Sequence, residues 1–379
     1  MGVITGLSGN EMYCLSRKGF SPGNLAVGNS VFSLGFISGF GAGLKTLVGG
    51  EVEQVTEVIH EGRFNSFQRM QQDAARHGGI GITGVSSEII QQGGNVEFLS
   101  IGSCLHSANA TGPEQLQFST SADGQELYCQ MDCGFHPIHF AFGNVAYSIG
   151  VGGGIGGALR SLARGEVVEY SQVFNFTRHL ALDRIAMDAK RNGANAVVGI
   201  QTSIVPFQGM QEMVMIGTAS KHDGLPADAA QMPVTSDLTN EEMWNVVSMG
   251  YLPLRLVMGV SVYSLGIVGG VTSMFKSLGR GEIPELTTLI YEARENALGK
   301  ISDEATRIGA DDVLGIQTYV YDLGSGLIEF LAIGTAVRKT QGVGTVTPQL
   351  IPQAIIKDKN TFFNTAERAL GSNLGTPTR

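Results

Sequence analysis

An internal repeat constrains the fold of this chain more than any other feature of its sequence. Matching residues recur 115 and then 116 positions apart, as at Glu11, Glu126 and Glu242, and such matches run through the whole unit. A recurring unit of this kind predicts a chain of three tandem domains. We expect the repeats at 1–106, 123–221 and 239–339, linkers at 107–122 and 222–238, and a mostly flexible tail at 340–379.

Each repeat opens with the signature of a short helix. A Ser, Asp or Thr is followed three residues later by Glu, and these two side chains can satisfy two backbone N–H groups at a helix start. A glycine then ends the helix, and a proline three positions later prevents its continuation. The residues are Ser8, Glu11, Gly19 and Pro22, then Asp123, Glu126, Gly134 and Pro137, then Thr239, Glu242, Gly250 and Pro253.

The rest of each repeat predicts a strand, a long helix and two more strands. Branched and aromatic residues at 138–147 and 254–263 indicate the first strand. A glycine-rich segment follows and ends at Gly-Glu, at 50–51, 165–166 and 281–282. Beyond it an apolar stripe predicts a helix of roughly twenty residues, and 196–205 and 212–219 form a strand pair. The fold class is α+β, with three tandem two-layer α/β repeats of order α-β-α-β-β.

Charge and cysteine usage exclude several protein classes. The net charge is −9 and no cluster of Lys and Arg occurs, which argues against a nucleic-acid partner. The four cysteines are irregularly spaced and the third repeat has none, so reduced thiols in a cytoplasm are expected. The N-terminus lacks the apolar run of a signal peptide.

Several motifs resemble those of the YbjQ family, small bacterial proteins also described as heavy-metal-binding domains. They are Gly28-Asn29 and Gly143-Asn144 after the first strand, the Gly-Glu before the long helix, the run 192–200, and 215–219 with its match at 332–336. The resemblance implies a dodecin-like two-layer domain whose single-domain members assemble as pentameric rings. It carries over no catalytic residue.

An arginine occupies the same position on the apolar stripe of every repeat, at Arg63, Arg178 and Arg294. A guanidinium on a buried face needs a partner. The candidates are the matched carboxylates that start the last strand, Glu97, Glu212 and Glu329, or those of the Gly-Glu motif, Glu51, Glu166 and Glu282. One interpretation is a structural ion pair within or between subunits. The other is a polar ring that lines a pore or a binding site.

Repeat two alone contains a cluster of four side chains that can bind a transition metal such as zinc: Cys129, Cys133, His136 and His139. The cysteines lie one helical turn apart, whereas the histidines follow the Gly134 helix end, where the chain turns away. The alternative is two core thiols and two strand histidines. The run 152–157 contains G-x-G-x-x-G without the strand–turn–helix context of a dinucleotide site, so no organic cofactor is expected.

Three segments lack charged residues: 19–44, 133–159 and 256–275. Burial between subunits explains such segments, and so does shallow insertion into a membrane surface. We therefore expect a non-enzymatic, self-assembling scaffold or binding protein that forms a ring or larger homo-oligomer. The alternatives are a heavy-metal-binding or metal-responsive protein and a membrane-associated ring.

Overall fold

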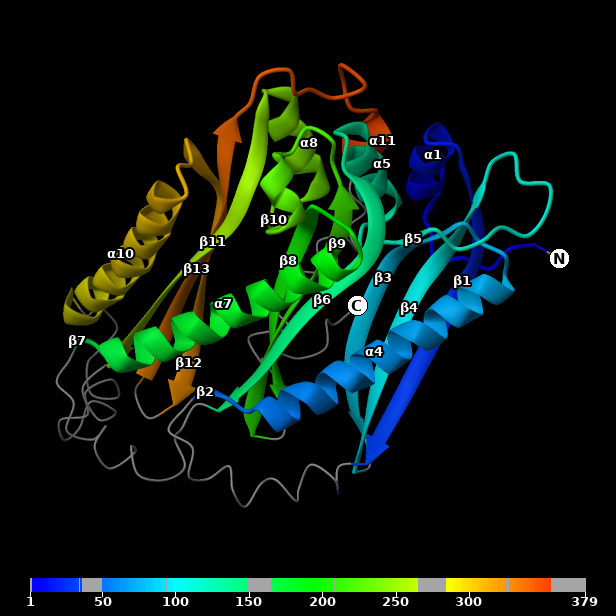
Figure 1. Ribbon diagram of the computed structural model, residues 1–379. Helices are drawn as coiled ribbons and strands as arrows, with labels where there is room; N and C mark the ends of the chain where they lie inside the picture. The colour runs from blue at the N-terminus through cyan, green and yellow to red at the C-terminus, as the bar shows by residue number, and fades with distance from the viewer. Residues whose placement is uncertain are drawn as a thin grey trace.

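The computed structural model describes residues 2–33, 35, 50–92, 94–148, 165–207, 209–264, 284–324 and 327–355. These residues form three tandem α+β units that stand side by side (Figure 1). The later parts of the three uncharged segments lie outside the described residues, as do the G-x-G-x-x-G run, Glu282 and residues 356–379.

The short helix that opens each repeat begins at the predicted capping box. In all three, the N-cap side chain accepts a hydrogen bond from the backbone of the Glu three residues on, and that Glu accepts one from the N-cap backbone. The glycines at the ends, Gly19, Gly134 and Gly250, adopt the left-handed conformation that ends a helix. The helices are α1 (Gly9–Arg17), α5 (Gly124–Asp132) and α8 (Asn240–Ser248).

The first strand of each repeat begins earlier than its composition predicts. Pro22, Pro137 and Pro253 lie inside the strands, at positions where the register with the neighbouring strand shifts. Proline has no N–H to donate to the ladder of hydrogen bonds. It can therefore be accommodated at such an irregularity, where the regular ladder is interrupted. The strands are β1 (Phe20–Ser33), β6 (His136–Ser148) and β11 (Tyr251–Ser264).

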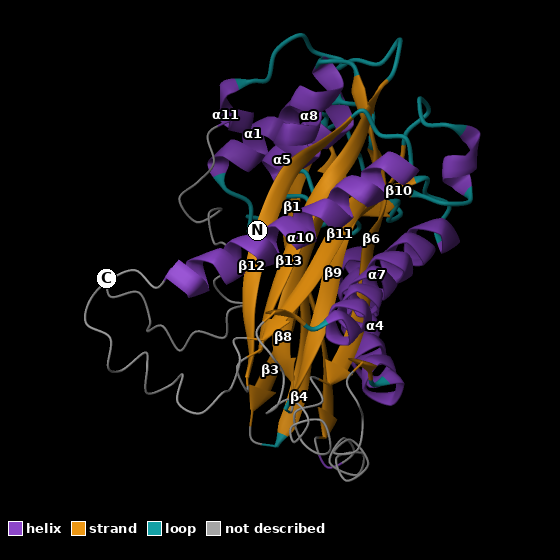
Figure 2. Cartoon of the chain, turned by 90° about the vertical axis from the view of Figure 1, so that its left-hand side faces the viewer, coloured by secondary structure: helices purple, strands orange, loops and turns teal. Residues whose placement is uncertain are grey.

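A long helix and an antiparallel strand pair complete each repeat. The long helices are α4 (Glu53–Arg76), α7 (Val168–Arg191) and α10 (Pro284–Arg307). The strand pairs are β3 (Gly81–Gln92) with β4 (Asn95–Ser107), β8 (Ala196–Phe207) with β9 (Met210–Lys221), and β12 (Asp312–Gly324) with β13 (Leu327–Lys339). Figure 2 shows the strands aligned along one common axis, with the long helices outside and the short helices gathered at one end.

The three sheets include strands from outside their own repeats. Their orders are β1-β4-β3-β5, β10-β8-β9-β6-β2 and β12-β13-β11-β7. The linkers supply β5 (Phe118–Ser119) and β10 (Val234–Thr235), which pair in parallel with β3 and β8. The Gly-Glu motifs supply β2 (Gly50–Glu51) and β7 (Gly165–Glu166), and each joins the sheet of the following repeat. Each of these two repeats therefore donates a strand to the next.

The tail is packed where the structure describes it. We expected mostly flexible residues from 340 onward, but residues 340–355 cross the short helices and include α11 (Pro352–Ile355), with Ala354 fully buried. The buried carboxylate of Asp132, at the end of α5, accepts hydrogen bonds from Lys18 Nζ at 2.7 Å, Trp244 Nε1 at 2.8 Å and Thr347 Oγ1 at 2.6 Å. Burial alone would raise the pKa of Asp132, but these bonds outweigh it and lower that pKa.

Each long helix lies against its own sheet at a glycine that permits a very close approach. A Cβ on Gly143 would lie 2.4 Å from the Ala181 carbonyl oxygen and 2.5 Å from the Ile185 nitrogen. Both are backbone atoms of α7, so no side-chain movement can make room. The matched glycines Gly28 and Gly259 meet α4 and α10 in the same way.

We expect Gly143→Ala to lower the free energy of unfolding by about 1–3 kcal/mol, because α7 must move away from β6. Gly299→Ala is the control, since a Cβ there meets nothing within 4 Å and lies in the middle of α10. That change should stabilise the chain by about 0.5–1 kcal/mol. Urea unfolding followed by circular dichroism measures both, and effects of equal sign would contradict the close approach.

Candidate assembly interface

The long helices of repeats one and two each contact two repeats. One side of α4 packs on β1 and β4, and the other side packs on β6 of repeat two. The helix α7 lies in the same way between its own sheet and β11 of repeat three. Apolar side chains fill both junctions, Val55 and Ile59 against Ala146 at the first, and Tyr170 and Phe174 against Val262 at the second.

The strand transfer fixes the start of each helix at the junction. Gly50 and Glu51 pair with Ser148 and Tyr147, and the hydroxyl of Thr56 accepts a hydrogen bond from the Ala146 amide at 2.9 Å. The second junction repeats the arrangement at matched positions: Gly165 with Ser264, Glu166 with Tyr263, and the Ser171 hydroxyl with the Val262 amide at 2.8 Å. The two junctions are therefore copies of one interface.

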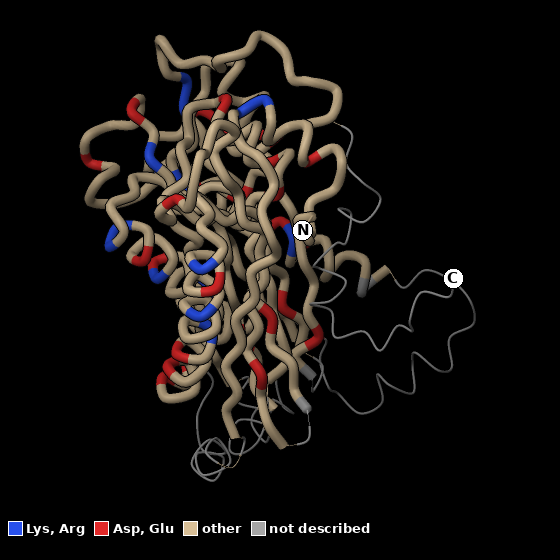
Figure 3. Tube along the Cα trace, turned by 90° about the vertical axis from the view of Figure 1, so that its right-hand side faces the viewer, with Lys and Arg blue, Asp and Glu red and all other residues tan. Residues whose placement is uncertain are grey.

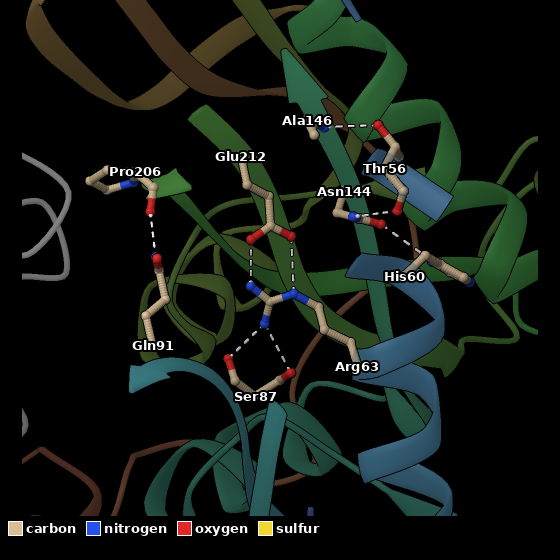
Figure 4. A network of polar contacts seen from close by, with 9 residues as sticks. All are labelled: Thr56, His60, Arg63, Ser87, Gln91, Asn144, Ala146, Pro206 and Glu212. Carbon is tan, nitrogen blue, oxygen red and sulfur yellow. Dashed lines mark hydrogen bonds and ion pairs between the residues drawn. The ribbon is translucent and has the colours of Figure 1, made fainter. Parts of the chain in front are cut away.

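A buried ion pair lies deeper in the first junction (Figure 4). Arg63 of α4 donates through Nε and Nη2 to the two carboxylate oxygens of Glu212, at 3.0 and 2.7 Å. Its remaining terminal nitrogen donates to the carbonyl and hydroxyl oxygens of Ser87, at 2.9 and 3.0 Å. The side chains of Arg63 and Glu212 are 2% and 0% exposed. The guanidinium is thus bound on both sides and belongs to the protein core.

The second junction contains the matched pair. Arg178 of α7 donates through Nε and Nη2 to Glu329 of β13, with a shortest distance of 2.7 Å, and both side chains are fully buried. Its Nη2 also donates to the Tyr147 hydroxyl at 2.8 Å, and the guanidinium lies 4.4 Å from the centre of that ring. Burial alone would lower the pKa of Arg178, but Glu329 and Tyr147 raise it, so the guanidinium stays charged.

A second, more exposed ion pair lies beside each transferred strand. Glu51 of β2 meets Arg184 of α7 at 2.6 Å, and Glu166 of β7 meets Lys300 of α10 at 3.0 Å. Glu51 and Glu166, the glutamates of the first two Gly-Glu motifs, therefore partner the long helix of the next repeat, and they are not the partners of the buried arginines.

The third arginine and the first glutamate lie apart, at opposite ends of the chain. Arg294 is exposed on α10, and Glu97 is half-buried on β4, where it accepts a hydrogen bond from Asn29 at 3.0 Å. The sequence places Arg63 and Glu97 in one repeat, but the structure pairs Arg63 and Arg178 each with the glutamate of the repeat that follows. Matched positions in the sequence identify the three arginines and the three glutamates. Which arginine pairs with which glutamate depends on how the repeats are arranged in space.

The four metal candidates of repeat two do not converge. Cys129 and Cys133 are fully buried, Cys129 among the short helices, and Cys133 Sγ donates to the Gln130 carbonyl at 3.3 Å. His136 is exposed at the start of β6, while His139 lies 3.6 Å from Asp188 on α7. Within the described ranges, which include all four residues, no three His, Cys, Asp or Glu side chains are placed to hold a metal ion. The residues present do not fit the expected zinc site.

Burial also keeps the two thiols and the His139 imidazole in their neutral forms. It raises the pKa of Cys133 to about 12 and that of Cys129 further, and it lowers the pKa of His139 to about 4. The thiolate is the form that binds metals, and these raised pKa values make it scarce at neutral pH.

The membrane-associated alternative has no transmembrane helix to support it: in the part of the chain that the structure describes, every helix is too short or too polar to span a bilayer.

The sequence matches a protein family described as “Putative heavy-metal-binding”, with matches at 23–103, 136–223 and 250–340. A protein of Mycobacterium tuberculosis named encapsulin nanocompartment protein Rv1762c is 31% identical over 229 residues, which cover 58% of this chain and 85% of that protein. A UPF0145 protein of Methanoregula boonei is 34% identical over 110 residues, 27% of this chain and 92% of its own length. A UPF0145 protein of Thermosipho africanus is 40% identical over 85 residues, 22% of this chain and 79% of its own.

Removal of one partner of the buried pair should destabilise the chain strongly. We expect Glu212→Ala to cost about 3–5 kcal/mol, because Arg63 stays buried without a counter-charge. The double variant Arg63→Met with Glu212→Leu should lie near the wild type, since both charges leave together. Denaturant unfolding of the two variants measures the difference, and equal losses would show that the pair itself supplies net stability.

All four cysteines are free and buried, so native thiols should react slowly. We expect a chromogenic disulfide reagent to titrate four thiols only after unfolding, because the raised thiol pKa values and burial both suppress the reactive thiolate. The protein equilibrated with zinc and then desalted should hold no stoichiometric metal, and Cys133→Ser should match it. One zinc ion per chain that Cys133→Ser removes would restore the metal site.

Proposed function

The chain belongs to the YbjQ family, with three tandem copies of the family's domain, and we propose that it is a non-enzymatic scaffold that assembles with further copies of itself. The proposal specifies a ring or larger homo-oligomer as the product. A scaffold of this kind needs surfaces that match one another and remain open in the single chain.

One observation carries the proposal. The same interface forms between repeats one and two and between repeats two and three, each time with a bidentate Arg–Glu pair. Its two halves then recur at the ends of the chain, with Arg294 exposed on α10 and Glu97 half-buried on β4. An interface whose two halves differ generates rings or filaments when it repeats between molecules. The name of the mycobacterial relative, an encapsulin nanocompartment protein, supports an assembly role.

The absence of catalysis is also part of the proposal. Catalytic groups must reach a substrate, whereas the buried arginines that recur on α4 and α7 donate all their terminal nitrogens to protein atoms: Arg63 to Glu212 and Ser87, and Arg178 to Glu329, Tyr147 and Met213. The free thiols among the short helices are buried with raised pKa values, so they are poor nucleophiles. They favour a reducing compartment such as the cytoplasm.

The family description also suggests heavy-metal binding, but it has no matching group among the residues that the structure describes. We therefore assign the function to the interface between a long helix and the sheet of the next repeat. The apolar and ionic contacts of the two internal junctions supply the chemistry of the proposed assembly.

We expect the purified 379-residue chain to form particles whose mass is an integral multiple of 40.1 kDa. Mass photometry at nanomolar concentration and sedimentation at micromolar concentration measure this mass, and negative-stain micrographs separate closed rings from other particles. A chain that sediments as a monomer at micromolar concentration would refute the proposed function.

A further inference from the structure

We infer that the outer face of α10 in one copy docks on the outer face of β1 and β4 in a second copy, and that Arg294 pairs there with Glu97. The inference rests on the proposed function and specifies its contact. The chain already contains this interface twice, so comparison with the two junctions shows which surfaces of α10, β1 and β4 would meet.

The outer face of β1 is exposed where its counterparts are buried. Val27 and Val31 are 42% and 59% exposed. The matched residues of β6 and β11 are at most 3% exposed because α4 and α7 cover them: Phe142, Ala146, Met258 and Val262. Since β1 is the edge strand of its sheet among the described residues, it also offers the edge that β6 and β11 use to receive β2 and β7.

The outer face of α10 has the complementary exposure. Tyr291 is 63% exposed, and Ile290 and Leu298 are only partly buried. The residues matched to Ile290 and Leu298 on α4 and α7 are at most 1% exposed: Ile59, Phe67, Phe174 and Leu182. Arg294 lies on this face, at the position of the two buried arginines. The face thus combines apolar side chains with one cation, as the donor helices of both junctions do.

The acceptor carboxylate occupies the same place in every sheet. Glu97 stands opposite Val31 in the register of β1 with β4, as Glu212 stands opposite Ala146 and Glu329 opposite Val262. A helix seated on β1 as α4 is seated on β6 would therefore bring its arginine to Glu97. The partner that fits both the apolar strip and this carboxylate is α10 of a second copy.

General charge attraction does not select this contact. Figure 3 views the repeat-one end, where Lys and Arg are interspersed with Asp and Glu. Selection therefore depends on the apolar fit and on the single pair, as at an interface core from which other charges are excluded.

Head-to-tail docking of this kind also limits the size of a closed ring. Every chain contributes three repeats, so the number of repeats in a ring is a multiple of three. Five repeats, the ring implied by the single-domain relatives, cannot close by this contact. A ring built this way contains whole chains, beginning with two chains and six repeats.

Charge reversal tests the contact. We expect Arg294→Glu and Glu97→Arg each to raise the concentration for half-assembly at least about 100-fold, because each opposes like charges across the contact. The double variant should assemble, and so should an equimolar mixture of the two single variants, because each then meets an opposite charge. Arg307→Glu on the same helix is the control, because the matched Arg76 and Arg191 stay exposed at the internal junctions.

Sedimentation and mass photometry measure assembly, and circular dichroism checks that each variant is folded. A monomeric wild type refutes the proposed function. An assembled wild type whose mass neither reversal changes refutes this contact and leaves the assembly standing. Loss of assembly in both single variants, without recovery in the double variant or in the mixture, refutes the Arg294–Glu97 pairing.

Discussion

The buried ion pair between a long helix and the next repeat's sheet determines how the three units fit together. Apolar contacts alone allow neighbouring surfaces to slide, because they have little directional preference. A guanidinium that donates to two carboxylate oxygens and also to a further hydroxyl or carbonyl, as Arg63 does to Glu212 and Ser87 and Arg178 does to Glu329 and Tyr147, is satisfied in one arrangement only. Since a desolvated pair adds little net stability, its main effect here is on geometry. The transferred strands β2 and β7 pair with β6 and β11 at the same two junctions.

Local chemistry made much of each repeat predictable. The capping boxes, the glycines that end the helices and the stripe on the long helix depend on residues a few positions apart, and all occur as expected. The extra strands were not predicted because β2 and β7 are two residues long and acquire their conformation from a partner in another repeat. The helices end before the prolines as predicted, but the position of each proline inside a strand was not predictable, because a bulge depends on the neighbouring strand and has no local signal.

The candidate site residues were likewise predictable only in part. Matched position identified Arg63, Arg178 and Arg294 together with their three glutamates, because an arginine on an apolar stripe is costly without a partner. It could not tell that two of the three arginines have a following repeat and the third does not. The Cys–His cluster of repeat two does not form a metal site for a different and local reason. A helix end separates the sulfurs from the imidazoles, and the intervening turn sends them to different surroundings.

Strand transfer and the Asp132 contacts also have a consequence for protein synthesis. A chain leaves the ribosome from its N-terminus, so β2 emerges well before β6, the strand on which it pairs. Asp132 likewise emerges long before Trp244 and Thr347, which share its carboxylate. No repeat can complete its contacts alone during translation, and the packed core is finished only when Ala354 has left the exit tunnel. The three copies are thus synthesised one after another but complete their folding together.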